Sequence, residues 1–384
     1  MLALRPKPVR MADPNDWLTR KPAPMSTESR SACPRCERLP DAPRESGRLW
    51  LWPPLGHTLG KLRGALEAAG LAPTMLEGGQ GLCVELERRS EQVETLAADL
   101  SRQELTDTRA LFVPPGREPG LEDYGRVTSL AQFVAYSGSG WLIDLLGESR
   151  LTVHFQPMFS AADPTEVVAH ESLMRGLDRE GGIISPGPML GAARDADLLF
   201  QLDLAARRAA IQEASRHGAG GRVFINFSPA SIYDPEYCLR TTMAALEATD
   251  LRPEQLVFEI IESDQINDVS KLRRIVDTYR AHGCGVALDD IGSGYSSLNI
   301  LHQLQPDFIK LDMELVRDVD STPYKAAIAR KLLELATEIG VPTIAEGVET
   351  AAELDWVREH GATLIQGFYL SRPAPEPRTV TGDL

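Results

Sequence analysis

Two adjacent carboxylates end an apolar run in the segment VALDDIGSGYSSL, residues 286–298. Asp289 and Asp290 carry like charges, and their repulsion at the end of a buried strand is costly unless a cation lies between them. Neighbouring residues on a regular strand point to opposite faces, but at a strand end the backbone can turn and let both side chains reach one rim. A carboxylate placed to touch two metal ions would explain the pair.

Oxygen ligands also stand at the ends of the other apolar runs. Several carboxylates on one rim would repel one another or take up protons unless cations neutralised them. Any one of these acids could instead be structural, paired with an arginine or a backbone amide. Carboxylate and amide oxygens without a His or Cys cluster suit Mg²⁺ or Mn²⁺, and two such ions about 3.5–4 Å apart serve phosphoryl chemistry. These run ends contribute Glu171, Asn226, Glu259, Glu262, Asp289, Asp290, Lys310, Asp312, Glu346, Glu349 and Gln366.

The elements that must position these residues begin at Val153, where short apolar runs alternate with helical patterns. This alternation predicts a TIM-like (β/α)8 barrel, whose site lies where the strands end. A doubly wound open sheet is the structural alternative. Residues 160–166 join the first two runs and are too few for a crossover helix, so we expect at least one antiparallel strand. The predicted strands are 153–159, 167–174, 222–228, 256–261, 285–290, 308–312, 342–348 and 364–370, and the predicted helices are 188–217, 235–248, 266–282, 296–304, 323–339 and 351–360.

Residues 150–374 resemble an EAL domain, the family of cyclic di-GMP phosphodiesterases. The matching segments are FQPMF, HESLMRG, FINFSP, FEIIES, ALDDIGSGYSSL, FIKLD, IAEGVET and IQGFYLSRP, in the family's order. The resemblance implies an α/β fold: a modified TIM barrel with an antiparallel first strand, in agreement with the short connection. It also implies hydrolysis of cyclic di-GMP to linear pGpG by a two-metal, water-activated mechanism. A homodimer through barrel helices is a further implication.

The resemblance implies a role for each residue at a matching position. One divalent ion, Mg²⁺ or Mn²⁺, would be held by Glu171, Asn226, Glu259 and Asp289, and a second by Asp289, Asp290 and Glu346. Lys310 would orient or activate the attacking water. Glu262 would anchor the loop 290–298, and Glu349 and Gln366 would support the site. Contacts with the dinucleotide are implied for Gln156, Leu173, Arg175, Asp312 and Gln366, where the fork of Arg175 can grip a phosphate with two hydrogen bonds.

Three positions depart from the family pattern. Ser172 replaces the alanine of the signature tripeptide, Ile291 stands where phenylalanine is usual, and Gly176 stands where an aromatic residue is common. Ser172 should face away from Glu171 on a strand, and every metal-ligand position is present. We therefore expect an active enzyme, with a slow or inactive cyclic di-GMP receptor or scaffold, signalling through its N-terminal domain, as the alternative.

The N-terminal part has a different composition. We expect a disordered tail over residues 1–30, rich in Pro, Ser, Arg and Lys. We expect a small α/β sensory or regulatory domain over residues 31–120 and a linking helix over 121–150. The barrel should follow over 151–374, and a C-terminal tail over 375–384. Cys33 and Cys36 form a CxxC that could be reduced thiols, half of a zinc site or a redox pair. The segment GGQG at residues 78–81 predicts a hairpin turn, and we expect no synthesis of cyclic di-GMP.

The composition of the chain limits the classes of partner that it can bind. The chain has 384 residues, five cysteines and a formal net charge of −15. This charge argues against binding to a nucleic-acid polymer or an anionic membrane surface, because both need basic surface. No apolar run reaches the roughly 20 residues that span a bilayer, and so few cysteines in so long a chain do not make a disulfide framework. The prediction is a cytoplasmic protein.

Overall fold

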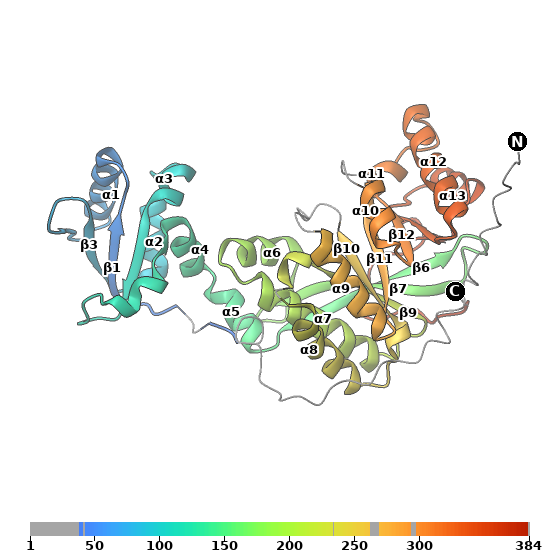
Figure 1. Ribbon diagram of the computed structural model, residues 1–384, viewed down its shortest axis with the longest axis horizontal. Helices are drawn as coiled ribbons and strands as arrows, with labels where there is room; N and C mark the ends of the chain where they lie inside the picture. The colour runs from blue at the N-terminus through green and yellow to red at the C-terminus, as the bar shows by residue number, and fades with distance from the viewer. Residues whose placement is uncertain (1–37, 41–42, 233, 262–268, 293–296, 383–384) are drawn as a thin grey trace, which may run out of the picture. The chain divides into compact units, whose positions relative to one another are not determined.

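The computed structural model describes residues 38–40, 43–232, 234–261, 269–292 and 297–382 (Figure 1). Cys33, Cys36 and Glu262 lie outside these residues. The chain forms two compact units: one draws on Thr152–Arg175 and Asp203–Leu384, and the other on Pro34–Leu151 and Gly176–Leu202. The second unit, called here the N-terminal unit, therefore includes a segment that follows the first two barrel strands in sequence.

The N-terminal unit is built on a five-stranded sheet in the order β2-β3-β1-β4-β5. The central strand β1 pairs antiparallel with both β3 and β4. Leu49 and Leu51 of β1 are fully buried against Leu62 and Leu66 of α1, as strand alternation against a helix requires. The elements are β1 (Gly47–Trp52), α1 (Gly56–Ala68), β2 (Thr74–Met75), β3 (Leu82–Leu86), α2 (Arg89–Ala97), α3 (Arg102–Asp107), β4 (Arg109–Val113), the 3₁₀ helix η2 (Leu121–Arg126), β5 (Thr128–Ser129), α4 (Leu130–Gly138) and α5 (Gly140–Gly147).

Two sequence predictions for this unit can be compared with it directly. Gly78 and Gly79 have positive φ angles of 89° and 70° in the turn between β2 and β3, which confirms the predicted hairpin turn. The linking helix expected over 121–150 consists instead of the 3₁₀ helix η2, the short strand β5 and the two helices α4 and α5, which meet at Ser139. Ser139 stands between Gly138 and Gly140, and two glycines so close together disfavour a continuous helix.

The C-terminal sheet closes into a barrel. Its strand order is β6-β14-β13-β12-β11-β10-β9-β7-β8, and an additional pairing of β6 with β7 completes the ring. β6 pairs antiparallel with β14, and the short strand β8 pairs antiparallel with β7. The neighbouring strands in the order β7-β9-β10-β11-β12-β13-β14 pair in parallel. The predicted barrel with an antiparallel first strand is confirmed, and the open-sheet alternative is wrong. The strands are β6 (Leu151–Ser160), β7 (Val167–Leu177), β8 (Ile183–Ile184), β9 (Arg222–Phe227), β10 (Leu256–Ile261), β11 (Gly285–Ile291), β12 (Phe308–Leu311), β13 (Thr343–Ala345) and β14 (Leu364–Ile365).

The helices follow the predicted alternation with one break. A single helix was expected over 188–217, but α6 (Pro186–Asp195) ends before α7 (Leu199–Arg216) begins. Asp197 adopts a left-handed φ of 58° between them, and Leu198 is 1% exposed. The turn therefore buries a leucine at the cost of helix continuity. The remaining helices are α8 (Pro235–Glu247), α9 (Val269–Ala281), α10 (Ser297–Leu304), α11 (Met313–Val316), α12 (Pro323–Ile339) and α13 (Ala351–Glu359), and Figure 1 shows several of them around the strands.

Strands β13 and β14 are shorter than the predicted 342–348 and 364–370. Gly347 leaves the extended conformation with a φ of 68° directly after β13. A Cβ atom at Gly347 would lie 2.4 Å from the Cβ of Met313, so only glycine fits this close approach.

Among the described residues, no helix has the length and apolar character needed to cross a membrane.

Candidate active site

An apolar layer inside the barrel sets the position of the site. It contains one buried residue from each barrel strand and a second, Val168, from β7. The eight are Met158, Ala169, Phe224, Val257, Ala287, Phe308, Ile344 and Leu364. Side chains two residues apart along a strand lie on the same face, so the residue two positions further towards the carboxyl end of each parallel strand also faces the interior. Because β6 runs in the opposite direction, its corresponding residue stands two positions earlier in the sequence.

This count defines a polar layer at the carboxyl ends of the parallel strands. Each member stands two positions from a member of the apolar layer, and the rule holds for all eight strands. The polar layer comprises Gln156, Glu171, Asn226, Glu259, Asp289, Lys310, Glu346 and Gln366. All of these residues were predicted from the sequence as site residues.

Lys310 lies at the centre of this layer and is 1% exposed. Its Nζ lies 2.5 Å from Glu346 Oε1 and 2.7 Å from Glu259 Oε1. The same atom lies 3.1 Å from Asp289 Oδ1 and 3.7 Å from Glu171 Oε1. Burial lowers the pKa of this ammonium, but the four carboxylates outweigh burial and raise it well above its ordinary value. Lys310 is therefore charged throughout the physiological range.

Glu171 is the best-supported carboxylate of the layer. Asn226 Nδ2 donates a hydrogen bond of 2.8 Å to Glu171 Oε1, and Gln366 Nε2 donates one of 2.7 Å to Oε2. Burial raises the pKa of Glu171, but Lys310, Gln366 and Asn226 together lower it below the ordinary value. Glu171 is thus held as an anion with both oxygens oriented.

Glu259 and Glu346 are in the opposite electrostatic state. Burial and the neighbouring carboxylates raise the pKa of both groups well above the ordinary range. Neither oxygen of Glu259 accepts a hydrogen bond from the described residues, although Lys310 Nζ lies 2.7 Å from Oε1. Buried oxygens without donors are costly, and a divalent cation is the partner that carboxylates in this state fit best. The residues present therefore fit a metal-ion site.

Asp290 joins the layer through a backbone irregularity. The register of β11 against β12 shifts between Leu288 and Ile291, and Asp290 has a left-handed φ of 57°. Carboxylate oxygens of Asp289, Asp290 and Glu346 come within 4.8 Å of one another. Burial, then Asp289 and Asp312, raise the pKa of Asp290 to about 6. The bulge thus answers how two neighbouring carboxylates reach one rim.

The positions implied for dinucleotide contact lie around this layer. Gln156 is 8% exposed, and Leu173 is half-buried. The guanidinium of Arg175 donates to the carbonyl oxygens of Met174 at 2.8 Å and Leu173 at 3.4 Å. Asp312 caps α11 by accepting a 2.5 Å hydrogen bond from the backbone N–H of Glu314. Arg175 and Asp312 are therefore engaged with the backbone in this state of the protein.

Glu349 lies in a different environment from the polar layer. It forms an ion pair of 2.6 Å with Arg317, and its side chain is 43% exposed. Glu262 and residues 293–296, the middle of the loop it was expected to anchor, lie outside the described residues. The supporting roles predicted for Glu262 and Glu349 remain predictions.

One buried pair near the site was missed at the sequence level. Asp203 Oδ1 accepts a 2.9 Å hydrogen bond from the backbone N–H of Ser228, two residues after Asn226. Arg207, which is 2% exposed, forms a 2.9 Å ion pair with Asp203. This pair holds the chain where β9 ends. Its only sequence signal was an acid and a base four residues apart on a helix, which is common on solvated surfaces.

Comparison with known proteins gives independent evidence about the family to which this chain belongs. The EAL domain profile matches residues 141–373. Cyclic di-GMP phosphodiesterase NbdA of Pseudomonas aeruginosa is 31% identical over 234 residues, covering 60% of this chain and 30% of that protein. The chain spans between 28% and 45% of the length of three curated relatives that it matches.

Solved structures agree. A standalone EAL protein from Vibrio cholerae O395, in its c-di-GMP bound form, is 33% identical with a TM-score of 0.54 and covers 60% of this chain and 95% of that chain. The PaMucR phosphodiesterase in complex with c-di-GMP is 28% identical with a TM-score of 0.55, covering 61% and 96%. Family match, barrel topology and polar layer coincide in one region, and the chain belongs to the EAL domain family.

Proposed function

We propose that this chain hydrolyses one phosphodiester bond of cyclic di-GMP and releases linear pGpG. The observation that carries the proposal is the set of five carboxylates, from Glu171, Glu259, Asp289, Asp290 and Glu346, gathered around the single ammonium of Lys310. If all are ionised, four negative charges are left over, and two divalent cations would balance them. An arrangement built only for stability would not concentrate unbalanced charge in this way.

The resemblance to EAL domains supplies the two proposed ligand sets. Glu171, Asn226, Glu259 and Asp289 would hold one Mg²⁺ or Mn²⁺ ion, and Asp289, Asp290 and Glu346 a second. When bound, such ions stabilise charge on phosphoryl oxygens and lower the pKa of a water molecule. The proximity of Asp289, Asp290 and Glu346, within 4.8 Å, supports the second set.

Lys310 would act as a hydrogen-bond donor. Its pKa is raised well above the ordinary value by the surrounding carboxylates, so it does not take up a proton from water near neutral pH. A fixed ammonium can instead orient the lone pairs of an attacking water and favour negative charge near the phosphate. Of the roles considered for Lys310, orientation is thus better supported than proton abstraction.

Arg175 would hold the substrate in place. Among the residues that the structure describes, its guanidinium donates to the backbone carbonyls of Met174 and Leu173, so a phosphate could replace these neutral acceptors with a charged one. Gln156, Leu173, Asp312 and Gln366 would complete the contacts with the dinucleotide. The protein would act as a homodimer through barrel helices, which sedimentation analysis of the full chain can test.

The test is direct turnover. The purified 384-residue chain is incubated with cyclic di-GMP in Mg²⁺, in Mn²⁺ and in EDTA, and pGpG is quantified by chromatography. We expect pGpG with either metal, none in EDTA, and none from Glu171→Gln. Glu334→Gln is the matched control, since Glu334 is exposed and pairs with Lys331 on α12. Binding of cyclic di-GMP without pGpG in either metal would replace this proposal with the receptor alternative.

A further inference from the structure

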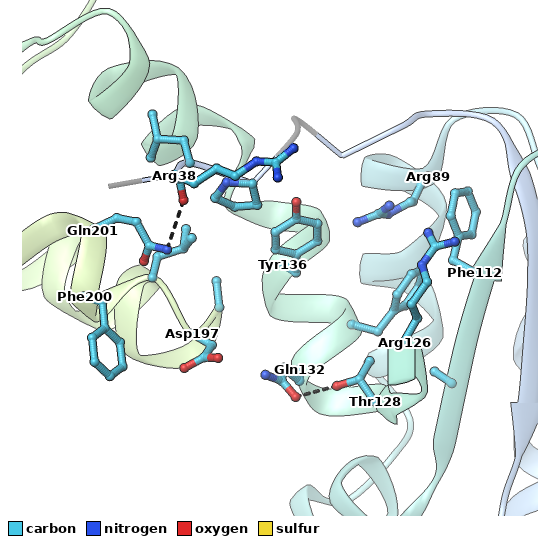
Figure 2. A pocket seen from close by; sticks show the side chains of 16 residues that line it. Arg38, Arg89, Phe112, Arg126, Thr128, Gln132, Tyr136, Asp197, Phe200 and Gln201 are labelled. Carbon is cyan, nitrogen blue, oxygen red and sulfur yellow. Dashed lines mark hydrogen bonds between the residues drawn. The ribbon is translucent and has the colours of Figure 1, made fainter. Parts of the chain in front are cut away.

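A cavity lies in the N-terminal unit, formed within Pro34–Leu151 and Gly176–Leu202 (Figure 2). Its volume is about 590 Å³, within the range of small-molecule sites. Side chains from α2, β4, β5 and α4 line it, together with the turn between α6 and α7. None of the polar-layer residues is among them. The cavity is therefore separate from the site proposed for cyclic di-GMP.

Arg89 is the most unusual residue in this cavity. It is 4% exposed, and its Nε donates a 2.8 Å hydrogen bond to Ser137 Oγ. Its Nη2 has no hydrogen-bond acceptor, and no carboxylate forms an ion pair with it, among the residues that the structure describes. Burial of a guanidinium without an anionic partner is costly. A buried cation in this state is suited to an anion supplied from outside.

The aromatic walls hold this cation in place. The guanidinium carbon of Arg89 lies 4.9 Å from the ring centre of Phe112 and 4.8 Å from that of Phe133. Tyr136 contributes a third ring at 5.4 Å. Figure 2 shows Arg89 directed towards Tyr136 across the lining residues. Such contacts offset part of the cost of burial. They leave N–H groups at the edge of the guanidinium able to donate further hydrogen bonds.

The rest of the lining carries the same sign of charge. Arg38 and Arg126 also line the cavity, against one acid, Asp197. Arg126 forms a 3.1 Å ion pair with Asp123, a residue outside the lining. A positive lining stands out in a chain whose formal net charge is −15. The positive charge of the lining favours a ligand with an anionic group, and the three aromatic rings favour a flat apolar body on that ligand.

We propose that this cavity binds a small molecule in which a carboxylate or phosphate is attached to a planar ring, with the anion on Arg89 and the ring against Phe112, Phe133 and Tyr136. The site goes beyond the proposed phosphodiesterase activity and uses none of its residues. Phe200 and Gln201, which also line it, fall within the segment matched to the EAL domain. A ligand here would touch the N-terminal sheet and also residues of the segment matched to the EAL domain.

The experiment measures binding to the full chain without turnover. Calorimetric titrations compare 1-naphthoate and 1-naphthyl phosphate with the neutral isostere 1-naphthamide. We expect at least one anion to bind tenfold or more tightly than the amide, and the tighter of the two identifies the anionic group. Arg89→Gln should reduce that preference at least tenfold. Equal binding of all three probes, or an unchanged preference in Arg89→Gln, would refute the site.

Two further variants keep the test interpretable if Arg89→Gln unfolds. Gln132 is exposed on α4 and lines the cavity, so Gln132→Trp should fill the space without disturbing the core and should abolish binding. Arg175→Gln tests whether the probes bind instead at the site proposed for cyclic di-GMP. If Arg175→Gln loses naphthoate binding and Gln132→Trp retains it, the proposal is overturned. Arg63→Gln, on the exposed face of α1, is the matched control and should bind as the parent does.

Discussion

Asp289 and Asp290 present their carboxylates to one rim because the backbone turns into the left-handed region at Asp290, with φ of 57°. The backbone N–H of Asp290 also donates a 2.9 Å hydrogen bond to Asp289 Oδ1, so the turn orients the first carboxylate as it redirects the second. Local strain at this position is retained because a regular strand would send one of the two outwards.

Asp290→Asn tests this pair. Asparagine tolerates a positive φ, so the substitution removes charge and keeps the backbone. Turnover should fall by more than the roughly 10–100-fold typical of residues that only support metal ligands. Without metal, the melting temperature at pH 7 should stay equal or rise, because one of two repelling charges is gone. A variant that melts lower in EDTA and retains turnover would contradict this account.

Lys310→Met tests the central ammonium. Removal of one partner from a buried ionic cluster typically costs about 3–5 kcal/mol of stability, and Lys310 has four carboxylate neighbours. We expect a loss of that order in urea denaturation without metal, with turnover abolished. Saturating Mg²⁺ or Mn²⁺ should recover part of the stability but none of the turnover. Lys331→Met, on the surface of α12, is the control and should change neither.

Glu259→Gln separates metal binding from folding. Ligand that binds only the native state stabilises it by about 2.7 kcal/mol at a concentration of 100 times Kd. The parent protein should therefore melt higher in saturating Mn²⁺ than in EDTA, and Glu259→Gln should lose much of this increment. Its melting temperature in EDTA should remain close to that of the parent, because the buried acid already favours its neutral form. An equal metal-induced increment in both proteins would remove Glu259 from the ligand set.

Glu104 predicts a pH dependence in the N-terminal unit. Its carboxylate accepts hydrogen bonds from the backbone of Ser101, from Lys61 and from Thr58, which lower its pKa from 4.5 to about 2. A lowered folded-state pKa contributes stability that is present above pH 4.5 and is lost as pH falls towards 2. Glu104→Gln should be less stable than the parent at pH 7, and the difference in urea midpoint should shrink between pH 4.5 and 3. A constant difference across that range would show that the charge is not what stabilises α3.

Much of the barrel and its site followed from the sequence alone. The sequence placed Asp289 at the end of an apolar run. In the structure, alternation accounts for its inward direction, because Asp289 stands two positions after Ala287 of the apolar layer. The same spacing recurs in every barrel strand, from Phe224 and Asn226 to Phe308 and Lys310. The short connection before β7 correctly required an antiparallel strand. These features depend on local spacing, which a linear sequence records.

Tertiary contacts decided the rest. The break at Asp197 depends on what buries Leu198, and the pairing of Glu349 with Arg317 joins residues 32 apart in sequence. Three features arise where several elements converge: the position of Lys310 among four carboxylates, the left-handed turn at Asp290, and the buried guanidinium of Arg89, which has no carboxylate partner among the described residues. Spacing along one strand or helix specifies which face a residue occupies. The distance and charge of its neighbours across the fold, which determine the pKa and the capacity to bind a ligand, exist only once the chain has closed on itself.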